Sequence, residues 1–215
     1  MKRRGIMRST ACVVTQTVVY PEDPAFQNPT KPVGAFLSEE EARKRAEETG
    51  YTYKEDAGRG WRQVVPSPQP QRIVEFDAIK DLMDDGYIVV STGGGGVPVI
   101  ERDDSYHGVP AVIDKDRSSA KLAADFRADM LVILTAVEKV CIDFNTPQQK
   151  AIDSMTVAEA EKYIQEGQFA AGSMLPKVQA CIEYVQAYPE GKALITSLES
   201  AAAGLKGETG TVITA

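Results

Sequence analysis

Short apolar segments alternate with helical patterns along this chain of 215 residues, and that alternation limits the fold more than any other feature. Strand-like runs lie at Tyr87–Thr92, Met130–Thr135 and Ala193–Thr196. Helical patterns occupy 118–128 and 176–188, with a proline suited to the first turn of the second. Strands that alternate with helices indicate a parallel sheet covered on both faces. We therefore expect an α/β fold.

The front of the chain has a different character. The apolar run from Ala11 to Tyr20 predicts one buried strand, because the polar residues inside it argue against a secretory segment. Residues 21–37 are rich in proline and are expected to form a loop. Short strand-like pieces follow at 51–65, and a proline-rich connector at 66–70 suggests a subdomain boundary.

Three further helices are predicted from their capping residues. Ser38 with Glu41 forms a capping box, and so does Thr156 with Glu159. Asp77 is expected to cap a third helix, which ends near residue 85.

Composition excludes several classes of function. A formal net charge of −7 disfavours a nucleic-acid surface, which needs clustered Lys and Arg. No apolar run reaches the length of a membrane span, so neither a nucleic acid nor a membrane is an expected partner. Three widely spaced cysteines without a Cys-x-x-Cys pair predict no disulfide framework and no metal site, and indicate the reducing cytoplasm.

Four consecutive glycines, Gly93, Gly94, Gly95 and Gly96, follow the strand Tyr87–Thr92 directly. Glycine allows the backbone N–H groups to approach phosphate or carboxylate oxygens closely. The spacing fits neither a P-loop nor a dinucleotide-binding fingerprint. The alternatives are an anion-binding loop and a plain tight turn.

Two lysines are candidates for binding an anion. Lys115 stands between Asp114 and Asp116, after the apolar residues 111–113, and strand ends at the carboxyl edge of an α/β sheet bind ligands. The alternative for this triplet is a solvated turn in which Asp116 caps the next helix. Lys177 enters the first turn of a helix, where a cation is mildly unfavourable unless an anion lies beside it. An exposed first-turn lysine is the alternative there.

Taken together, several segments of the chain resemble the carbamate kinases, members of the amino-acid kinase family. The segments that carry the resemblance are residues 23–32, 55–60, 64–68, 93–98, 111–116 and 172–178. The resemblance implies a three-layer αβα sandwich with a mainly parallel sheet and a small protruding subdomain. Residues 1–20 and 71–215 would form the core and residues 21–70 the subdomain. It also implies a homodimer.

The implied reaction moves a phosphoryl group between carbamoyl phosphate and ADP, giving ATP and carbamate, in arginine fermentation. Lys115 and Lys177 match lysines that contact the transferred phosphoryl group and the nucleotide phosphates, and Asp116 matches the acid that orients them. Lys31 matches a subdomain lysine on the carbamoyl phosphate side. The nucleotide would lie against Thr135, Ala136 and Val137, with Phe144 and Met174 near the adenine. Mg²⁺ would bridge the nucleotide phosphates with few or no protein ligands.

Members of this family begin with a strand that leads to a Gly-Gly-Asn phosphate loop, and this sequence does not show that segment. The second hypothesis is therefore a truncated or inactive remnant that binds nucleotide without catalysis. An assay for ATP formation separates the two hypotheses.

Overall fold

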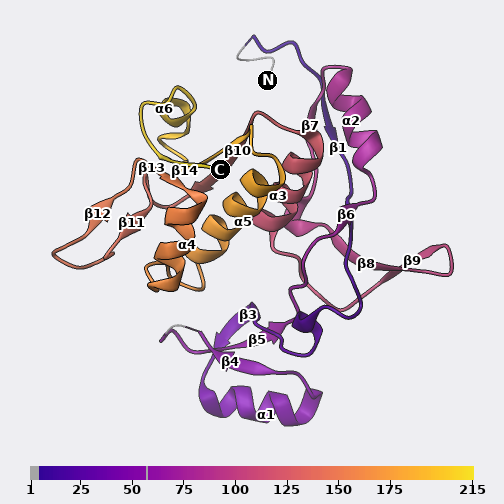
Figure 1. Ribbon diagram of the computed structural model, residues 1–215. Helices are drawn as coiled ribbons and strands as arrows, with labels where there is room; N and C mark the ends of the chain where they lie inside the picture. Colours follow the sequence, from indigo (N-terminus) through magenta and orange to yellow (C-terminus); the bar gives the residue numbers. More distant parts are fainter. Residues whose placement is uncertain (1–4, 57) are drawn as a thin grey trace. The chain divides into compact units, whose positions relative to one another are not determined.

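The computed structural model describes residues 5–56 and 58–215 and divides the chain into two compact units, Met1–Ser118 and Ser119–Ala215 (Figure 1). Helix α3, Lys115–Phe126, includes the boundary between them. Both units combine helices with parallel and antiparallel strand pairs, which confirms the expected α/β class. Among the described residues, no helix is long and apolar enough to cross a membrane.

Nine strands and two complete helices make up the described part of the first unit. The strands are β1 Thr10–Cys12, β2 Gln16–Val18, β3 Lys31–Leu37, β4 Tyr53–Glu55, β5 Trp61–Val65, β6 Arg72–Ile73, β7 Ile88–Val90, β8 Val97–Arg102 and β9 Ser105–Gly108. The helices are α1 Glu39–Thr49 and α2 Phe76–Asp84, with 3₁₀ turns at Pro24–Phe26 and Gly93–Gly95.

These strands form three small sheets. Strands β1 and β7 pair in parallel, and a second sheet has the order β6-β2-β8-β9 with a parallel pair β2-β8. The third sheet, β3-β5-β4, is antiparallel, and α1 lies along it (Figure 1). This third sheet falls inside the predicted subdomain 21–70, whose boundaries remain a prediction.

Three expectations for this unit are wrong in detail. The run Ala11–Tyr20 forms β1 and β2, which belong to different sheets, because Val14 between them turns outward and is 78% exposed. The expected loop at 21–37 contains β3, which pairs with β5 despite its proline, because β3 is an edge strand. Helix α2 begins after Glu75, so Asp77 lies in its first turn and does not cap it.

The second unit contains a four-stranded sheet with helices on its two faces. The strands of the unit are β10 Met130–Thr135, β11 Cys141–Ile142, β12 Lys150–Ala151, β13 Ser154–Thr156, β14 Lys192–Ser197 and β15 Thr211–Thr214, and its helices are α4 Val157–Gln165, α5 Met174–Ala187 and α6 Ala201–Leu205. The sheet order is β10-β14-β15-β13, with parallel pairs at both ends and an antiparallel centre. Strands β11 and β12 form a separate hairpin.

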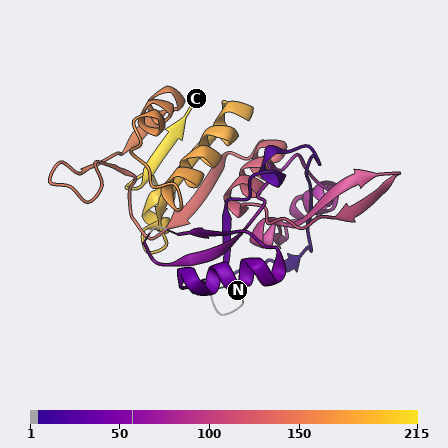
Figure 2. The ribbon, with the colours of Figure 1, turned by 90° about the horizontal axis from the view of Figure 1, so that it is seen from below.

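Alternate residues of β14 face opposite layers, as the period of a strand requires. Ala193 and Ile195 are fully buried in a core shared with α5, which runs beside this sheet in Figure 2. Leu194 and Thr196 lie against Gly204 of α6, where a Cβ atom would be crowded. The sheet that contains β14 is therefore the middle layer of an αβα arrangement in this unit.

Both predicted capping boxes are present. In α1 the Ser38 hydroxyl accepts from the Glu41 backbone N–H, and in α4 Thr156 and Glu159 repeat the pattern. Each box satisfies backbone N–H groups that a helix start leaves without a partner.

Candidate active site

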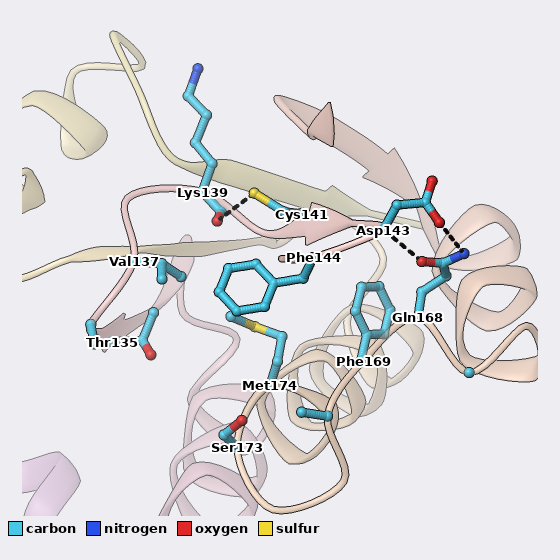
Figure 3. A pocket seen from close by; sticks show the side chains of 13 residues that line it. Thr135, Val137, Lys139, Cys141, Asp143, Phe144, Gln168, Phe169, Ser173 and Met174 are labelled. Carbon is cyan, nitrogen blue, oxygen red and sulfur yellow. Dashed lines mark hydrogen bonds between the residues drawn. The ribbon is translucent and has the colours of Figure 1, made fainter. Parts of the chain in front are cut away.

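A pocket of about 520 Å³ opens in the second unit, a volume typical of small-molecule sites. It lies between the end of β10, the hairpin β11-β12, the segment after α4 and the start of α5. All five residues predicted to contact a nucleotide line it, namely Thr135, Ala136, Val137, Phe144 and Met174. The structure thus brings together residues spread over 40 positions of sequence, which Figure 3 shows from close by.

The walls of this pocket are apolar and aromatic. The Phe144 ring, the Phe169 ring and the Met174 side chain are directed toward its centre (Figure 3). Phe169 is buried and meets Tyr163 edge-on, with 6.4 Å between ring centroids. Phe144 is 52% exposed. A planar heteroaromatic ring would find stacking surfaces here.

Polar groups stand at the rim of the pocket. Lys139 Nζ lies 2.5 Å from Asp153 Oδ1, and this hydrogen bond raises the pKa of the lysine. Lys139 therefore stays cationic at neutral pH. Asp143, which follows β11, and Gln168, which follows α4, are hydrogen-bonded to one another. Sequence reasoning missed Lys139, Cys141, Asp143, Gln168, Phe169 and Ser173, which all line the pocket.

The pocket adjoins the start of a long helix. Ser173 and Met174 line the pocket, and Met174 is the first residue of the 14-residue helix α5. Its first turn contains no acidic residue, and the Ser173 side chain makes no cap bond to the residues that the structure describes. Lys177 is half-buried one position beyond Pro176. The helix dipole and this cation both favour an anion at the pocket's edge.

The glycine segment of the first unit forms a 3₁₀ turn, not a helix start. The N–H groups of Gly95 and Gly96 donate to Thr92 and Gly93 carbonyl oxygens over 2.8 and 3.3 Å. Gly94, Gly95 and Gly96 have φ values of 67°, 103° and 85°, which L side chains rarely adopt. The N–H groups of Gly95 and Gly96 are thus bonded within the turn, and the anion-binding role expected of the four glycines stays a prediction.

Two hydroxyl groups hold this turn in place. Thr17 Oγ1 and Ser118 Oγ both donate to the Gly95 carbonyl, over 2.8 and 2.7 Å. Thr92, just before the glycines, is buried with φ of 50°, which is an outlier for a β-branched residue. Strained backbone that several contacts maintain is common at functional loops. Gly93 and Gly96 also line a hollow of about 300 Å³ in this unit.

Asp114 makes two side-chain contacts, one within the triplet of residues 114–116 and one to Lys31. Its Oδ1 accepts from the Asp116 backbone N–H over 2.9 Å, and its Oδ2 lies 2.5 Å from Lys31 Nζ. The helix expected from Ser118 instead begins at Lys115, and its cap is Asp114 rather than Asp116. Residues 111–113 form no strand, so the triplet does not follow a strand end. Lys115 and Asp116 occupy the first turn of α3.

Burial raises the pKa of Asp114, but the hydrogen bond and charge of Lys31 and the Asp116 N–H outweigh it, and the pKa is lowered. Asp114 is therefore an anion at neutral pH. Lys31, a predicted site residue, is thus held by a carboxylate that sequence reasoning did not place in the site. The expectation that Lys115 and Lys177 meet at one phosphate involves both units and stays a prediction.

In residues 5–56 and 58–215, no three His, Cys, Asp or Glu side chains gather as metal ligands would.

Several known proteins of similar sequence or structure are named carbamate kinases. Residues 30–196 match the model of the Amino acid kinase family. A carbamate kinase of Clostridium perfringens is 54% identical over 211 residues, 98% of this chain and 67% of that protein. One of Trichomonas vaginalis is 52% identical over 99% of this chain and 68% of that protein. Carbamate kinase of Giardia lamblia, solved bound to AMP-PNP, is 43% identical with a TM-score of 0.87 over 99% of this chain and 67% of that one.

The match to the family model over most of the chain, together with the α/β fold, shows that the chain belongs to the amino acid kinase family. Within that family it belongs with the carbamate kinases, at 54% and 52% identity to two of them. The expected resemblance and the expected enzyme class, a kinase, are confirmed. The chain spans about two thirds of the length of the curated relatives that it matches.

Proposed function

We propose that the pocket of the second unit binds the adenosine part of ADP or ATP in the carbamate kinase reaction. In that reaction the phosphoryl group leaves the carbamoyl oxygen of carbamoyl phosphate and joins the terminal phosphate of ADP, which yields carbamate and ATP. The observation that carries the proposal is the convergence of Thr135, Val137, Phe144 and Met174 in one pocket beside the start of α5. The AMP-PNP bound by the Giardia lamblia relative is an adenine nucleotide, which supports the assignment.

The charged residues supply what phosphoryl transfer requires. The reaction spreads negative charge over the equatorial oxygens, so a protein contributes alignment and positive charge more than covalent chemistry. Lys177 at the start of α5 would bind nucleotide phosphates, and Lys115 would contact the transferred group. Asp116, buried beside Lys115 in α3, would orient lysine side chains. Lys31 would serve the carbamoyl phosphate side.

The glycine turn would supply backbone N–H groups to phosphate oxygens. Gly93 and Gly94 come before the N–H groups that the turn uses internally. Mg²⁺, bound by nucleotide phosphates, would neutralise part of their charge. No step requires a protein carboxylate to hold that ion.

The cellular setting is part of the same proposal. Free thiols at Cys12, Cys141 and Cys181 suit the reducing cytoplasm. The resemblance to carbamate kinases supports a homodimer and a role in arginine breakdown, in which carbamoyl phosphate yields ATP.

The test is a coupled assay that follows ATP from carbamoyl phosphate, ADP and Mg²⁺. We expect ATP formation above the background reaction without protein, and its loss in a Lys177→Ala variant. Background-level ATP with the wild-type chain would overturn catalysis. ADP binding measured by calorimetry would in that case support the second hypothesis, a nucleotide-binding remnant.

A further inference from the structure

Asp143 and Gln168 join two segments of the pocket wall by hydrogen bonds that run in opposite directions (Figure 3). The Asp143 backbone N–H donates to Gln168 Oε1 over 2.7 Å, and Gln168 Nε2 donates to Asp143 Oδ1 over 3.3 Å. Both ends of the side-chain amide are used, which fixes its orientation. The pair therefore ties the hairpin β11-β12 to the segment that follows α4.

Each partner is followed directly by an aromatic residue of the pocket. Phe169, after Gln168, is buried and packed against Tyr163. Phe144, after Asp143, is half-exposed on a hairpin whose strands have only two residues each. One aromatic wall is consequently fixed by the core, while the other depends on how the hairpin is attached.

The backbone on both sides of Phe144 adopts an unfavourable conformation. Asp143 and Asn145, on either side of the ring, have φ values of 50° and 62°. Asn and Asp tolerate the left-handed region better than other residues with a Cβ, but still at some cost. The hairpin loop therefore needs contacts to hold this shape, and the two bonds to Gln168 supply them from outside the loop.

We infer that Asp143 and Gln168 are positioning residues that hold Phe144 at stacking distance from a nucleobase. The inference rests on the proposed nucleotide-binding function of the pocket. Their task is to set the affinity for the base, and they leave the rate of phosphoryl transfer unchanged. Because base stacking depends on ring placement, releasing the hairpin weakens ADP binding by about tenfold.

Charge-exchange variants test the pair without removing side chains. Gln168→Glu places a second carboxylate opposite Asp143, and repulsion should raise the Kd for ADP about tenfold. Asp143→Asn should change little, because its amide oxygen still accepts from Gln168. The combination Asp143→Asn with Gln168→Glu should restore affinity, since the new amide can donate to the new carboxylate.

The measurements are ADP titration calorimetry and steady-state kinetics, with thermal unfolding as a check on folding. At saturating ADP, kcat and the KM for carbamoyl phosphate should stay within about twofold of wild type in every variant. Gln148→Glu, the same exchange at an exposed glutamine of the hairpin that carries Phe144, is the matched control and should bind ADP normally.

Recovery of affinity in the double variant supports the inference. An unchanged Kd in Gln168→Glu, or a double variant as weak as that single variant, overturns it while leaving the proposed function intact. Absence of ADP binding by the wild-type chain overturns both.

Discussion

Lys31 and Asp114 lie 83 positions apart in the chain and form an ion pair, with Lys31 Nζ 2.5 Å from Asp114 Oδ2. The other oxygen of the same carboxylate caps helix α3 through the Asp116 backbone N–H. One buried carboxylate thus links strand β3 to the helix start that carries Lys115. Changes at Asp114 should act on the placement of two proposed site lysines at once.

Two substitutions separate the cap from the ion pair. Asp114→Asn keeps an oxygen that can cap α3, so we expect a loss of unfolding free energy below about 1 kcal/mol. Asp114→Ala removes cap and ion pair together and should cost about 2 kcal/mol. Urea unfolding measures both. Equal losses in the two variants would contradict the capping role.

The ion pair also predicts a pH dependence. The pKa of Asp114 lies below its usual value of 3.8, so the folded state binds this proton less readily than the unfolded state. The stabilisation is present above pH 3.8 and is lost as the pH falls through the lower folded pKa. Lys31→Met removes the hydrogen bond and the charge of Lys31, the two largest influences that lower this pKa, while burial and the Asp116 N–H bond remain.

The difference in unfolding free energy between wild type and Lys31→Met should therefore shrink as the pH falls from about 6 to about 3. Denaturant titrations at several pH values measure it. A difference that stays constant over this range would show that the pair contributes through packing alone.

The glycine turn allows function and folding to be separated. At Gly95, φ is 103° and an added Cβ would overlap the Ile113 carbonyl, so Gly95→Ala should destabilise the chain by more than about 2 kcal/mol. Gly93 has open space around it and no positive φ. Gly93→Ala should fold normally. It should lower the rate of ATP formation, because the added methyl group would keep phosphate oxygens away from the backbone N–H group.

Thermal unfolding measures the stability of both variants, and the coupled assay measures their rate of ATP formation. A Gly93→Ala variant with wild-type stability and wild-type rate would leave the glycines as a turn only.

Local chemistry explains why some features were predictable from sequence. The capping boxes at Ser38 and Thr156 depend on residues three positions apart, so the sequence alone specifies them. The start of α3 was misplaced because Asp114 acts through a cap and a distant partner, Lys31, that local pattern does not reveal. Strand β3 was missed because its proline suggests a loop, whereas an edge strand tolerates it.

Some pocket residues were likewise predictable from the sequence, and others were not. Thr135, Phe144 and Met174 were predicted through the resemblance to a family, and the structure lines one pocket with them. Asp143 and Gln168 were missed because their contact joins residues 25 positions apart and has no sequence motif. A paired amide and acid on two loops becomes visible only when the fold brings the loops together.

Lys177 provides a test of the proposed electrostatic role. Lys177→Ala removes a cation from the first turn of α5, and we expect ATP formation to fall about a hundredfold. Folding should change little, because alanine favours helix and the macrodipole opposes a cation there. The coupled assay and thermal unfolding measure the two effects. An unchanged rate would remove Lys177 from the proposed site.

The most direct test of the central claim, that the pocket of the second unit holds the nucleotide, is the rate at which a thiol reagent alkylates Cys141. Cys141 lines that pocket and is half-buried, so a bound nucleotide would shield it. Peptide mass spectrometry follows the modification with no addition, with ADP and with carbamoyl phosphate. The account predicts that saturating ADP slows alkylation of Cys141 severalfold while carbamoyl phosphate alone does not. Equal rates with and without saturating ADP would contradict it.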